Sequence, residues 1–203
     1  MLNDQEIMER VRSGQVEMFD ELVNRHRSSM LRAAVSKLRN QAVAEEAVQD
    51  AFLAAFAHRH TYRADHSFRG WLWTILLNTC RGLARREIGR TDRAGTQGVF
   101  EVADEPCSSD DALSRLVRAE QAALLFRFLN ELPEAQADAL RLRFFGELKF
   151  DEIAQAMNCS TNGAKQRVRT GLERLSAALQ RADVSSIDAN DISQSDRSEG
   201  DSR

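Results

Sequence analysis

The scarcity of proline is the feature that most constrains the fold of this chain. Only two of its 203 residues are proline, Pro106 and Pro133, and proline interrupts a helix more strongly than any other residue. Long helices are therefore permitted almost everywhere. Runs in which Val, Ile, Thr or aromatic residues alternate with polar ones, as in strands, are not found. The chain is expected to be all-α.

The first half of the sequence carries three amphipathic stripes at helical spacing. They span residues 19–38, 43–56 and 68–83. Asn40 and residues 61–67 supply the breaks between them. Three such helices can bury a shared core, so we expect a first small helical domain over residues 1–90.

Composition marks a linker and a tail. Residues 91–112 are rich in Gly, Ser and Asp and poor in apolar side chains, which is typical of a flexible linker. Ser, Asp and Asn dominate residues 183–203, which are expected to form a disordered acidic tail. Periodicity resumes between them, so a second small helical domain is expected over residues 113–182.

The formal net charge of −3 is unevenly distributed along the chain. The tail holds six acidic residues against two arginines. Residues 81–93 hold five arginines against two acidic residues, and residues 160–182 hold five basic residues against one acidic residue. Two basic patches thus lie on a nearly neutral body, either as DNA-binding surfaces or as solvated helix faces.

Several protein classes are disfavoured. No apolar run approaches the roughly 20 residues that span a bilayer, and the polar residues 1–12 predict no signal peptide. The three cysteines, Cys80, Cys107 and Cys159, are odd in number and far apart, which suits a reducing cytoplasm better than a disulfide framework. Neither zinc-ligand spacing nor paired catalytic groups are found. We expect a cytoplasmic protein without enzymatic activity, metal or cofactor.

Residues 133–179 predict three consecutive helices. Pro133 and Glu134 favour the start of the first helix, and Gly146 is a suitable left-handed residue to end it. A short helix over 151–157 follows, then a turn in which Asn158 tolerates a left-handed conformation. Ser160 can cap a longer helix that ends near residue 179. The pattern indicates a helix-turn-helix.

The long helix of this motif has an apolar stripe and a polar face. The stripe consists of Ala164, Val168, Leu172 and Leu175, expected in the core. Lys165, Gln166, Arg169 and Thr170 lie off it, near the start of the helix, where a DNA-reading helix contacts base edges. Lys and Arg can donate to guanine, and Gln can bond bidentately to adenine. An antiparallel helix pair with a charged outer face would show a similar pattern.

Two segments together resemble extracytoplasmic-function (ECF) sigma factors of the sigma-70 family. The segment beginning LNELPEAQADAL at Leu129 resembles their minus-35-binding domain, and the segment beginning FDELVNRHRSSM at Phe19 resembles their promoter-melting domain. Both occur in the expected order, with the expected linker and no third domain between them. The resemblance implies a factor that binds core RNA polymerase, recognises minus-35 and minus-10 promoter elements and initiates transcription.

The resemblance also implies partners and site residues. The partners are promoter DNA, the clamp helices of the largest polymerase subunit, the flap of the second largest, and an anti-sigma factor, without direct membrane insertion. The minus-35 contacts would be Ser160, Lys165, Gln166, Arg167, Arg169 and Thr170. The minus-10 contacts would be Arg63, Asp65, Ser67, Phe68, Trp73, Asn78, Arg81, Arg85 and Arg86. The polymerase contacts would be Glu45, Glu46, Gln49, Asp50 and Phe52.

Melting explains the residue types around the minus-10 loop. Opening DNA requires protein contacts that replace lost stacking and pairing, which a polar loop beside a rigid aromatic helix can supply. Trp71 lies on the apolar stripe and is expected in the core. Trp73 lies two residues further on and is expected to be exposed.

Two other functions remain as alternatives. A stand-alone helix-turn-helix regulator that binds operator DNA as a dimer would account for the second domain but not for the first. A helical enzyme or metal protein would require paired catalytic groups or ligands.

Overall fold

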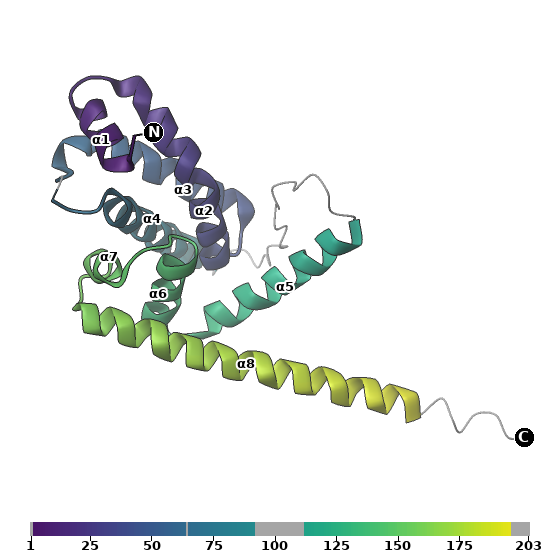
Figure 1. Ribbon diagram of the computed structural model, residues 1–203. Helices are drawn as coiled ribbons and strands as arrows, with labels where there is room; N and C mark the ends of the chain where they lie inside the picture. The colour runs from purple at the N-terminus through teal and green to yellow at the C-terminus, as the bar shows by residue number, and fades with distance from the viewer. Residues whose placement is uncertain (1, 64, 92–111, 196–203) are drawn as a thin grey trace, which may run out of the picture.

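The computed structural model describes residues 2–63, 65–91 and 112–195, and the described part is helical, with no strand (Figure 1). This confirms the all-α prediction. No helix in these ranges is both long and apolar enough to cross a membrane. The elements are α1 (Asp4–Arg12), η1 (Val16–Met18), α2 (Phe19–Leu38), α3 (Gln41–Ala57), η2 (Arg59–Thr61), α4 (Phe68–Thr91), α5 (Ala112–Glu131), α6 (Glu134–Phe144), α7 (Phe150–Ala156) and α8 (Thr161–Ser195).

Helix α1 was not predicted from the sequence. Asn3 caps it by accepting a hydrogen bond from the Glu6 backbone N–H (2.9 Å), while the Glu6 carboxylate accepts one from the Asn3 N–H (2.8 Å). This capping box satisfies two backbone groups that a helix start leaves without partners. The helix buries Ile7, Met8 and Val11 against the core. Only a narrow side of this helix is apolar, so its mostly polar sequence did not indicate a helix that packs on the core.

Helices α2, α3 and α4 form the core of the N-terminal half, residues 2–91. The break expected at Asn40 is confirmed: Arg39 adopts a left-handed conformation, and the Asn40 side chain caps α3. Phe19 of α2 packs edge-on against Phe52 and Phe56 of α3, with ring centroids 6.3 and 5.3 Å apart. These contacts hold the two helices in register.

Helices α5 to α8 form the C-terminal half, residues 112–195, and contain the predicted helix-turn-helix. Asn158 has a φ of 48°, as its place in the turn requires. The Ser160 hydroxyl accepts a hydrogen bond from the Gly163 N–H (3.1 Å) at the start of α8. The turn and cap are therefore confirmed.

The end of α6 differs from the prediction. The left-handed residue is Glu147, with a φ of 53°, rather than Gly146. Gly146 is needed for another reason: a Cβ there would lie 2.8 Å from the Leu142 carbonyl oxygen and 3.0 Å from the Trp73 ring. The glycine permits close packing rather than an unusual turn.

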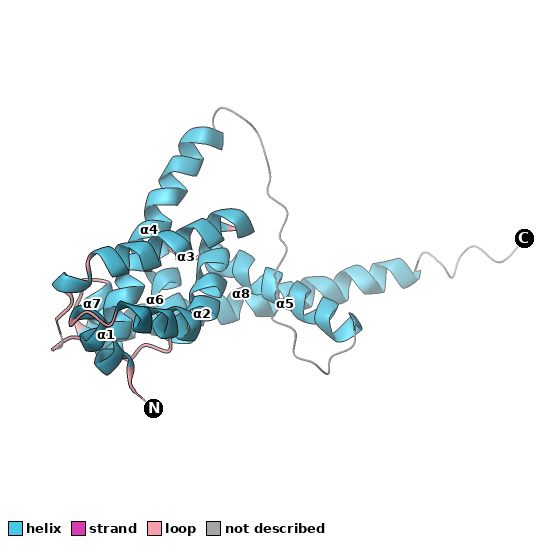
Figure 2. Ribbon diagram, turned by 90° about the horizontal axis from the view of Figure 1, so that it is seen from above, coloured by secondary structure: helices cyan, strands magenta, loops and turns pink. Residues whose placement is uncertain are grey.

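The last helix is longer than predicted. Helix α8 continues past residue 179 to Ser195, where disorder was expected from residue 183 onward, and projects beyond the other helices (Figures 1 and 2). No glycine or proline interrupts residues 172–195, so no strong stop signal is present. The remaining expected tail, 196–203, and the expected linker over 92–111 lie outside the described residues.

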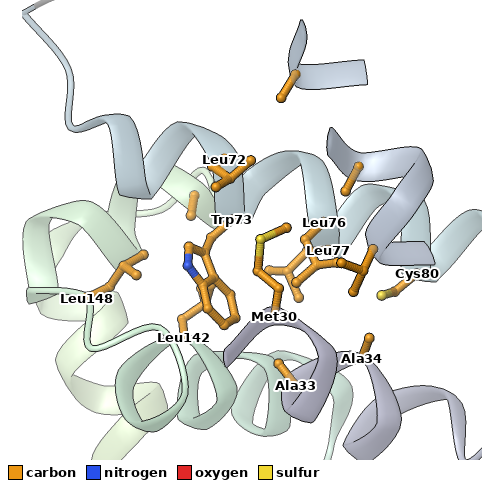
Figure 3. Close-up of a cluster of buried hydrophobic side chains, with 14 of the residues drawn as sticks. Met30, Ala33, Ala34, Leu72, Trp73, Leu76, Leu77, Cys80, Leu142 and Leu148 are labelled. Carbon is orange, nitrogen blue, oxygen red and sulfur yellow. The ribbon is translucent and has the colours of Figure 1, made fainter. Parts of the chain in front are cut away.

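The two halves pack against each other. Helix α7 contacts α4, and α5 contacts α2. Figure 3 shows Trp73 and Met30 of the N-terminal half in one apolar cluster with Leu142 and Leu148 of the C-terminal half. The core therefore continues across both halves.

Candidate functional site

The start of α8 presents the polar surface expected to read DNA. Lys165, Gln166 and Arg169 are exposed, whereas Arg167 and Thr170 are half-buried. The Arg169 Nε lies 2.9 Å from the Glu173 carboxylate, one turn further on. The Thr170 hydroxyl donates to the Gln166 carbonyl oxygen (2.8 Å), so its proton is engaged and its oxygen remains free to accept. Lys165 and Gln166 are therefore the exposed predicted contacts nearest the start of α8, and the Lys165 Nζ lies 6.0 Å from the centroid of the Phe150 ring.

Packing behind this surface fixes the direction in which it points. Ala164 and Val168 are buried, as expected. Leu172 was expected in the core but is 41% exposed, whereas Leu175, the last residue of the stripe, is half-buried against the core. Gly171 is buried, and a Cβ there would lie 3.1 Å from Leu140. This glycine lets α8 approach α6 closely.

The loop before α4 contains the first of the residues expected at the minus-10 element. Arg63 and Asp65 are exposed and paired, with Nη2 2.9 Å from Oδ2. The Tyr62 hydroxyl donates to the His66 carbonyl oxygen (3.0 Å), which anchors the loop. Ser67 is half-buried and donates to the Glu152 carboxylate of α7. The loop is thus in contact with the helix-turn-helix.

Two aromatic residues expected to contact DNA are buried instead. Phe68 is 1% exposed and packs against Tyr62 and Trp71, with ring centroids 5.8 and 5.9 Å apart. Trp73 is fully buried, and it lies beside Leu142 and Leu148 (Figure 3). The expectation that Trp73 is exposed was therefore wrong. Trp71 is half-buried at the surface, and Trp73 is in the core, because the C-terminal half covers the side of α4 that was expected to be open.

The polar residues further along α4 differ in their accessibility. Asn78, Arg85 and Arg86 are exposed. The Arg81 guanidinium is engaged by the C-terminal half, with Nη2 2.9 Å from Asp138 and Nε 3.4 Å from Glu134. Three of these four predicted DNA contacts therefore face solvent.

A buried polar network surrounds Asp138, whose side chain is fully buried. Its carboxylate lies 2.8 Å from Lys37 Nζ, 2.9 Å from Arg81 Nη2 and 3.2 Å from Arg141 Nη1. Such a carboxylate is tolerated in the interior only because cations surround it. Lys37 also forms a hydrogen-bonded ion pair with Glu134, and this pair lowers the pKa of the Glu134 carboxyl, which is otherwise largely exposed.

Arg141 extends this network toward α2. Its Nε donates to the Ser36 hydroxyl (2.8 Å), and its Nη2 donates to the Ser36 carbonyl oxygen (3.0 Å) and to Asn130 (2.9 Å). Burial lowers the pKa of this guanidinium, and the nearby Asp138 opposes that effect. The network joins residues about 100 positions apart, and no local pattern in the sequence predicted it.

The outer face of α3 carries the residues expected to meet the polymerase. Glu45, Glu46, Gln49 and Asp50 are all exposed. Phe52 is 7% exposed and faces the core, so it supports the helix from behind. Leu53 was not predicted, yet it is 61% exposed. It follows Glu46 and Asp50 at helical spacing and lies on their face. The sequence signal that could have identified Leu53 as part of this surface is its position seven residues after Glu46, two turns further along the helix.

No group of three or more His, Cys, Asp or Glu side chains is arranged to hold a metal ion within the described ranges. Burial raises the pKa of the Cys80 thiol to about 12, so this cysteine is an unreactive core residue. The half-buried Cys159 is likewise free.

Comparison with known families and proteins adds to this geometry. Residues 22–88 match the Sigma-70 region 2 family, and residues 122–175 match the Sigma-70, region 4 family. The chain is 29% identical over 181 residues to the RNA polymerase sigma-H factor of Pseudomonas aeruginosa, covering 87% of this chain and 94% of that protein. It is 27% identical over 186 residues to the ECF RNA polymerase sigma-E factor of Escherichia coli K12, covering 88% and 95%.

Two solved structures share the fold. One is CnrH in complex with the cytosolic domain of CnrY, with a TM-score of 0.66, 23% identity, and coverage of 88% of this chain and 97% of that chain. The other is the sigma factor RpoE in complex with the anti-sigma factor NepR from Bartonella quintana, with a TM-score of 0.61, 21% identity, and coverage of 80% and 96%. The arrangement of helices is therefore shared across most of the chain.

Proposed function

The chain belongs to the ECF type of the sigma-70 family, whose members bind core RNA polymerase and initiate transcription at promoters, and on this premise we propose which of its surfaces serves each partner. It acts as a nonenzymatic subunit. Residues 1–90 form the domain that docks on polymerase and melts the minus-10 element. Residues 113–182 form the domain that recognises the minus-35 element.

The exposed start of α8 reads the minus-35 element. Lys165 and Gln166 project from the first turns of the helix, where side chains reach base edges in the major groove. Arg167 and Arg169 contact the phosphates on either side, which positions the helix without reading sequence. Ser160 and Thr170 contribute hydroxyl contacts at the two ends of this surface.

The loop before α4 and the exposed side of α4 contact the minus-10 element. Arg63, Asp65 and Ser67 offer donors and acceptors to an extruded base. Asn78, Arg81, Arg85 and Arg86 follow along α4 and contact the backbone. Phe68 supports the loop from the core rather than touching DNA.

The outer face of α3 docks on the clamp helices of the largest polymerase subunit. The observation that carries this assignment is an exposed leucine, Leu53, on the same face as three exposed carboxylates, Glu45, Glu46 and Asp50. An exposed leucine beside several carboxylates suits a partner helix that presents both apolar and basic side chains. Gln49 lies within this face. The C-terminal domain meets the flap of the second largest subunit.

An anti-sigma factor is a further proposed partner. Two structures that share this fold are complexes, one with the cytosolic domain of CnrY and one with the anti-sigma factor NepR. The shared fold covers 88% and 80% of this chain, which supports a comparable surface for such a regulator.

Charge reversal on α3 tests the docking assignment. We expect Glu46→Lys/Asp50→Lys to weaken binding to sigma-free core polymerase at least tenfold, because both substitutions replace attraction with repulsion. Glu17→Lys is the control for a single charge reversal, since Glu17 is exposed on η1, outside α3. Binding is measured by titration of labelled core enzyme. Equal affinities for the wild type and the double variant would remove α3 from the interface.

A further inference from the structure

A cavity of about 680 Å³ lies outside all of the surfaces assigned above. Its walls are formed by the start of α1, by α2, by the start of α4, and by residues 144–147 at the end of α6 and just after it. Cavities of roughly 300–1,000 Å³ are typical of small-molecule sites. No residue proposed to contact polymerase, the minus-10 element or the minus-35 element lines this cavity. The side chains around it therefore serve none of the contacts described so far.

Arginines outnumber carboxylates around this cavity. The charged side chains that line it are Arg25, Arg32, Arg69, Asp4 and Glu147. The Asp4 carboxylate is already engaged, since it lies 2.8 Å from both Arg25 Nη1 and His26 Nε2. The Glu147 side chain is 80% exposed, and its Oε2 lies 3.9 Å from Arg69 Nη1, beyond hydrogen-bond distance. Exposed pairs of this kind contribute little, so Arg69 retains donors for another anion.

Arg32 also has donors to offer. It is exposed on α2, and its Nη1 donates to the Ser28 hydroxyl (3.0 Å). No carboxylate in the described part of the chain pairs with it. A guanidinium carries five N–H donors in a planar fork that matches the oxygens of a phosphate. The Ser28 hydroxyl can donate its own proton to the same anion, so α2 presents two donors to one side of the cavity.

An exposed aromatic ring lines the same cavity. Phe144, the last residue of α6, is 59% exposed. A single exposed apolar side chain is common and has no meaning by itself, but this ring shares its cavity with the two arginines that retain donors. Phosphates pair with guanidinium groups, and flat rings stack on aromatic side chains. A ligand that is both anionic and aromatic uses both features at once.

We propose that this cavity binds a nucleotide, whose phosphates accept hydrogen bonds from Arg32, Arg69 and Ser28 and whose base stacks on Phe144. Stacking on a phenylalanine ring does not select one base over another, so ADP and GDP should both bind. The inference adds a small-molecule ligand to the proposed function and does not rest on it, because the lining residues are separate from the polymerase and DNA contacts.

Titration calorimetry of the full chain at low ionic strength tests the proposal, with ADP, GDP and pyrophosphate as probes. Arg32→Gln should weaken the binding of all three about tenfold or more, because it removes a charged donor from the phosphates. Phe144→Ala should weaken ADP and GDP about fivefold or more and leave pyrophosphate unchanged, because only the base stacks on the ring. Arg27→Gln is the matched control, since Arg27 is an exposed arginine of α2 that does not line this cavity.

Photocrosslinking locates the bound nucleotide. Trypsin cleaves after Arg143 and Lys149, so Phe144 lies in a peptide of residues 144–149. An ADP analogue with an azido group on its base should label this peptide on illumination, as detected by mass spectrometry, and excess ADP should prevent the labelling. A label confined to other peptides would overturn the assignment of the base to Phe144.

The outcomes separate a nucleotide site from a simple anion site and from no site. Arg32 and Phe144 are exposed, so both variants should keep the circular dichroism of the wild type, and the binding losses then support the proposal. Absence of ADP and GDP binding at millimolar concentration would overturn it, and so would an unchanged affinity of Arg32→Gln. Equal binding of pyrophosphate and ADP, unaffected by Phe144→Ala, would overturn the recognition of a base. Because these measurements use neither polymerase nor promoter DNA, their failure leaves the proposed function standing.

Discussion

Asp4 anchors α1 to α2 through two hydrogen bonds. Its Oδ2 lies 2.8 Å from His26 Nε2, and its Oδ1 accepts from Arg25 Nη1 (2.8 Å). The hydrogen bond with His26, aided by Arg25 and opposed by partial burial, lowers the pKa of Asp4 to about 2. A carboxyl whose pKa is lower in the folded state stabilises that state in its ionised form.

The Asp4 carboxylate gives the stability of the protein a defined pH dependence. Its contribution is complete above the unfolded value of 3.8 and is lost as the pH falls toward 2. We expect Asp4→Asn to lower the free energy of unfolding by roughly 1–2 kcal/mol at pH 7 and by progressively less below pH 4. Urea unfolding at several pH values measures this. Asp20→Asn, at an exposed site on α2, is the control; a loss for Asp4→Asn that is independent of pH would refute the assignment.

Gln166 gives a prediction about promoter sequence. It is exposed near the start of α8 and is the residue there best suited to bond adenine bidentately. On a promoter recovered with the wild-type protein, Gln166→Ala should relax the preference at one minus-35 base pair by about 1–3 kcal/mol. Transcription from four templates that differ at that base pair measures the change. The control Gln121→Ala, on the exposed side of α5, should keep the wild-type preference. An unchanged preference for Gln166→Ala would show that Gln166 does not read bases.

At the scale of elements, periodicity and turn chemistry predicted most of the helices. The helix-turn-helix was predictable because Asn158 and Ser160 act through local backbone geometry. Helix α1 was missed because only three of its residues are buried. The end of α8 was misplaced because polar composition outweighed the absence of a stop signal. The role of Gly146 was assigned wrongly because its constraint is close packing against Leu148, Leu142 and Trp73, and Trp73 lies 73 positions away in the sequence.

Gly146 and Gly82 form a matched pair for testing helix packing. A methyl group at Gly146 would meet the Leu142 backbone and the Trp73 ring, so Gly146→Ala should lower the free energy of unfolding by about 1–3 kcal/mol. A methyl group at Gly82, within α4, would meet nothing within 4 Å, so Gly82→Ala should raise it by up to about 1 kcal/mol. Urea unfolding of both variants measures this. Equal effects at the two sites would contradict the close approach at Gly146.

At the scale of the whole molecule, the contact between the halves could not be predicted from the sequence. Lys37 and Asp138 appear in separate helical patterns, and nothing in either pattern indicates their pairing. The same contact explains why Trp73 was assigned wrongly, since a residue on the open side of one domain becomes buried when a second domain covers it. The exposure of Lys165 and Gln166 on α8 and of Glu46 and Asp50 on α3 was predictable because these residues do not take part in this contact.

The central claim is that this chain directs polymerase to promoters. The most direct test adds the purified protein to sigma-free core polymerase and pooled genomic DNA, and then sequences the 5′ ends of the transcripts. We predict discrete transcripts that share two upstream elements, near −35 and −10, and that are lost with Glu46→Lys/Asp50→Lys. An absence of transcripts, together with no binding to core enzyme, would contradict the account.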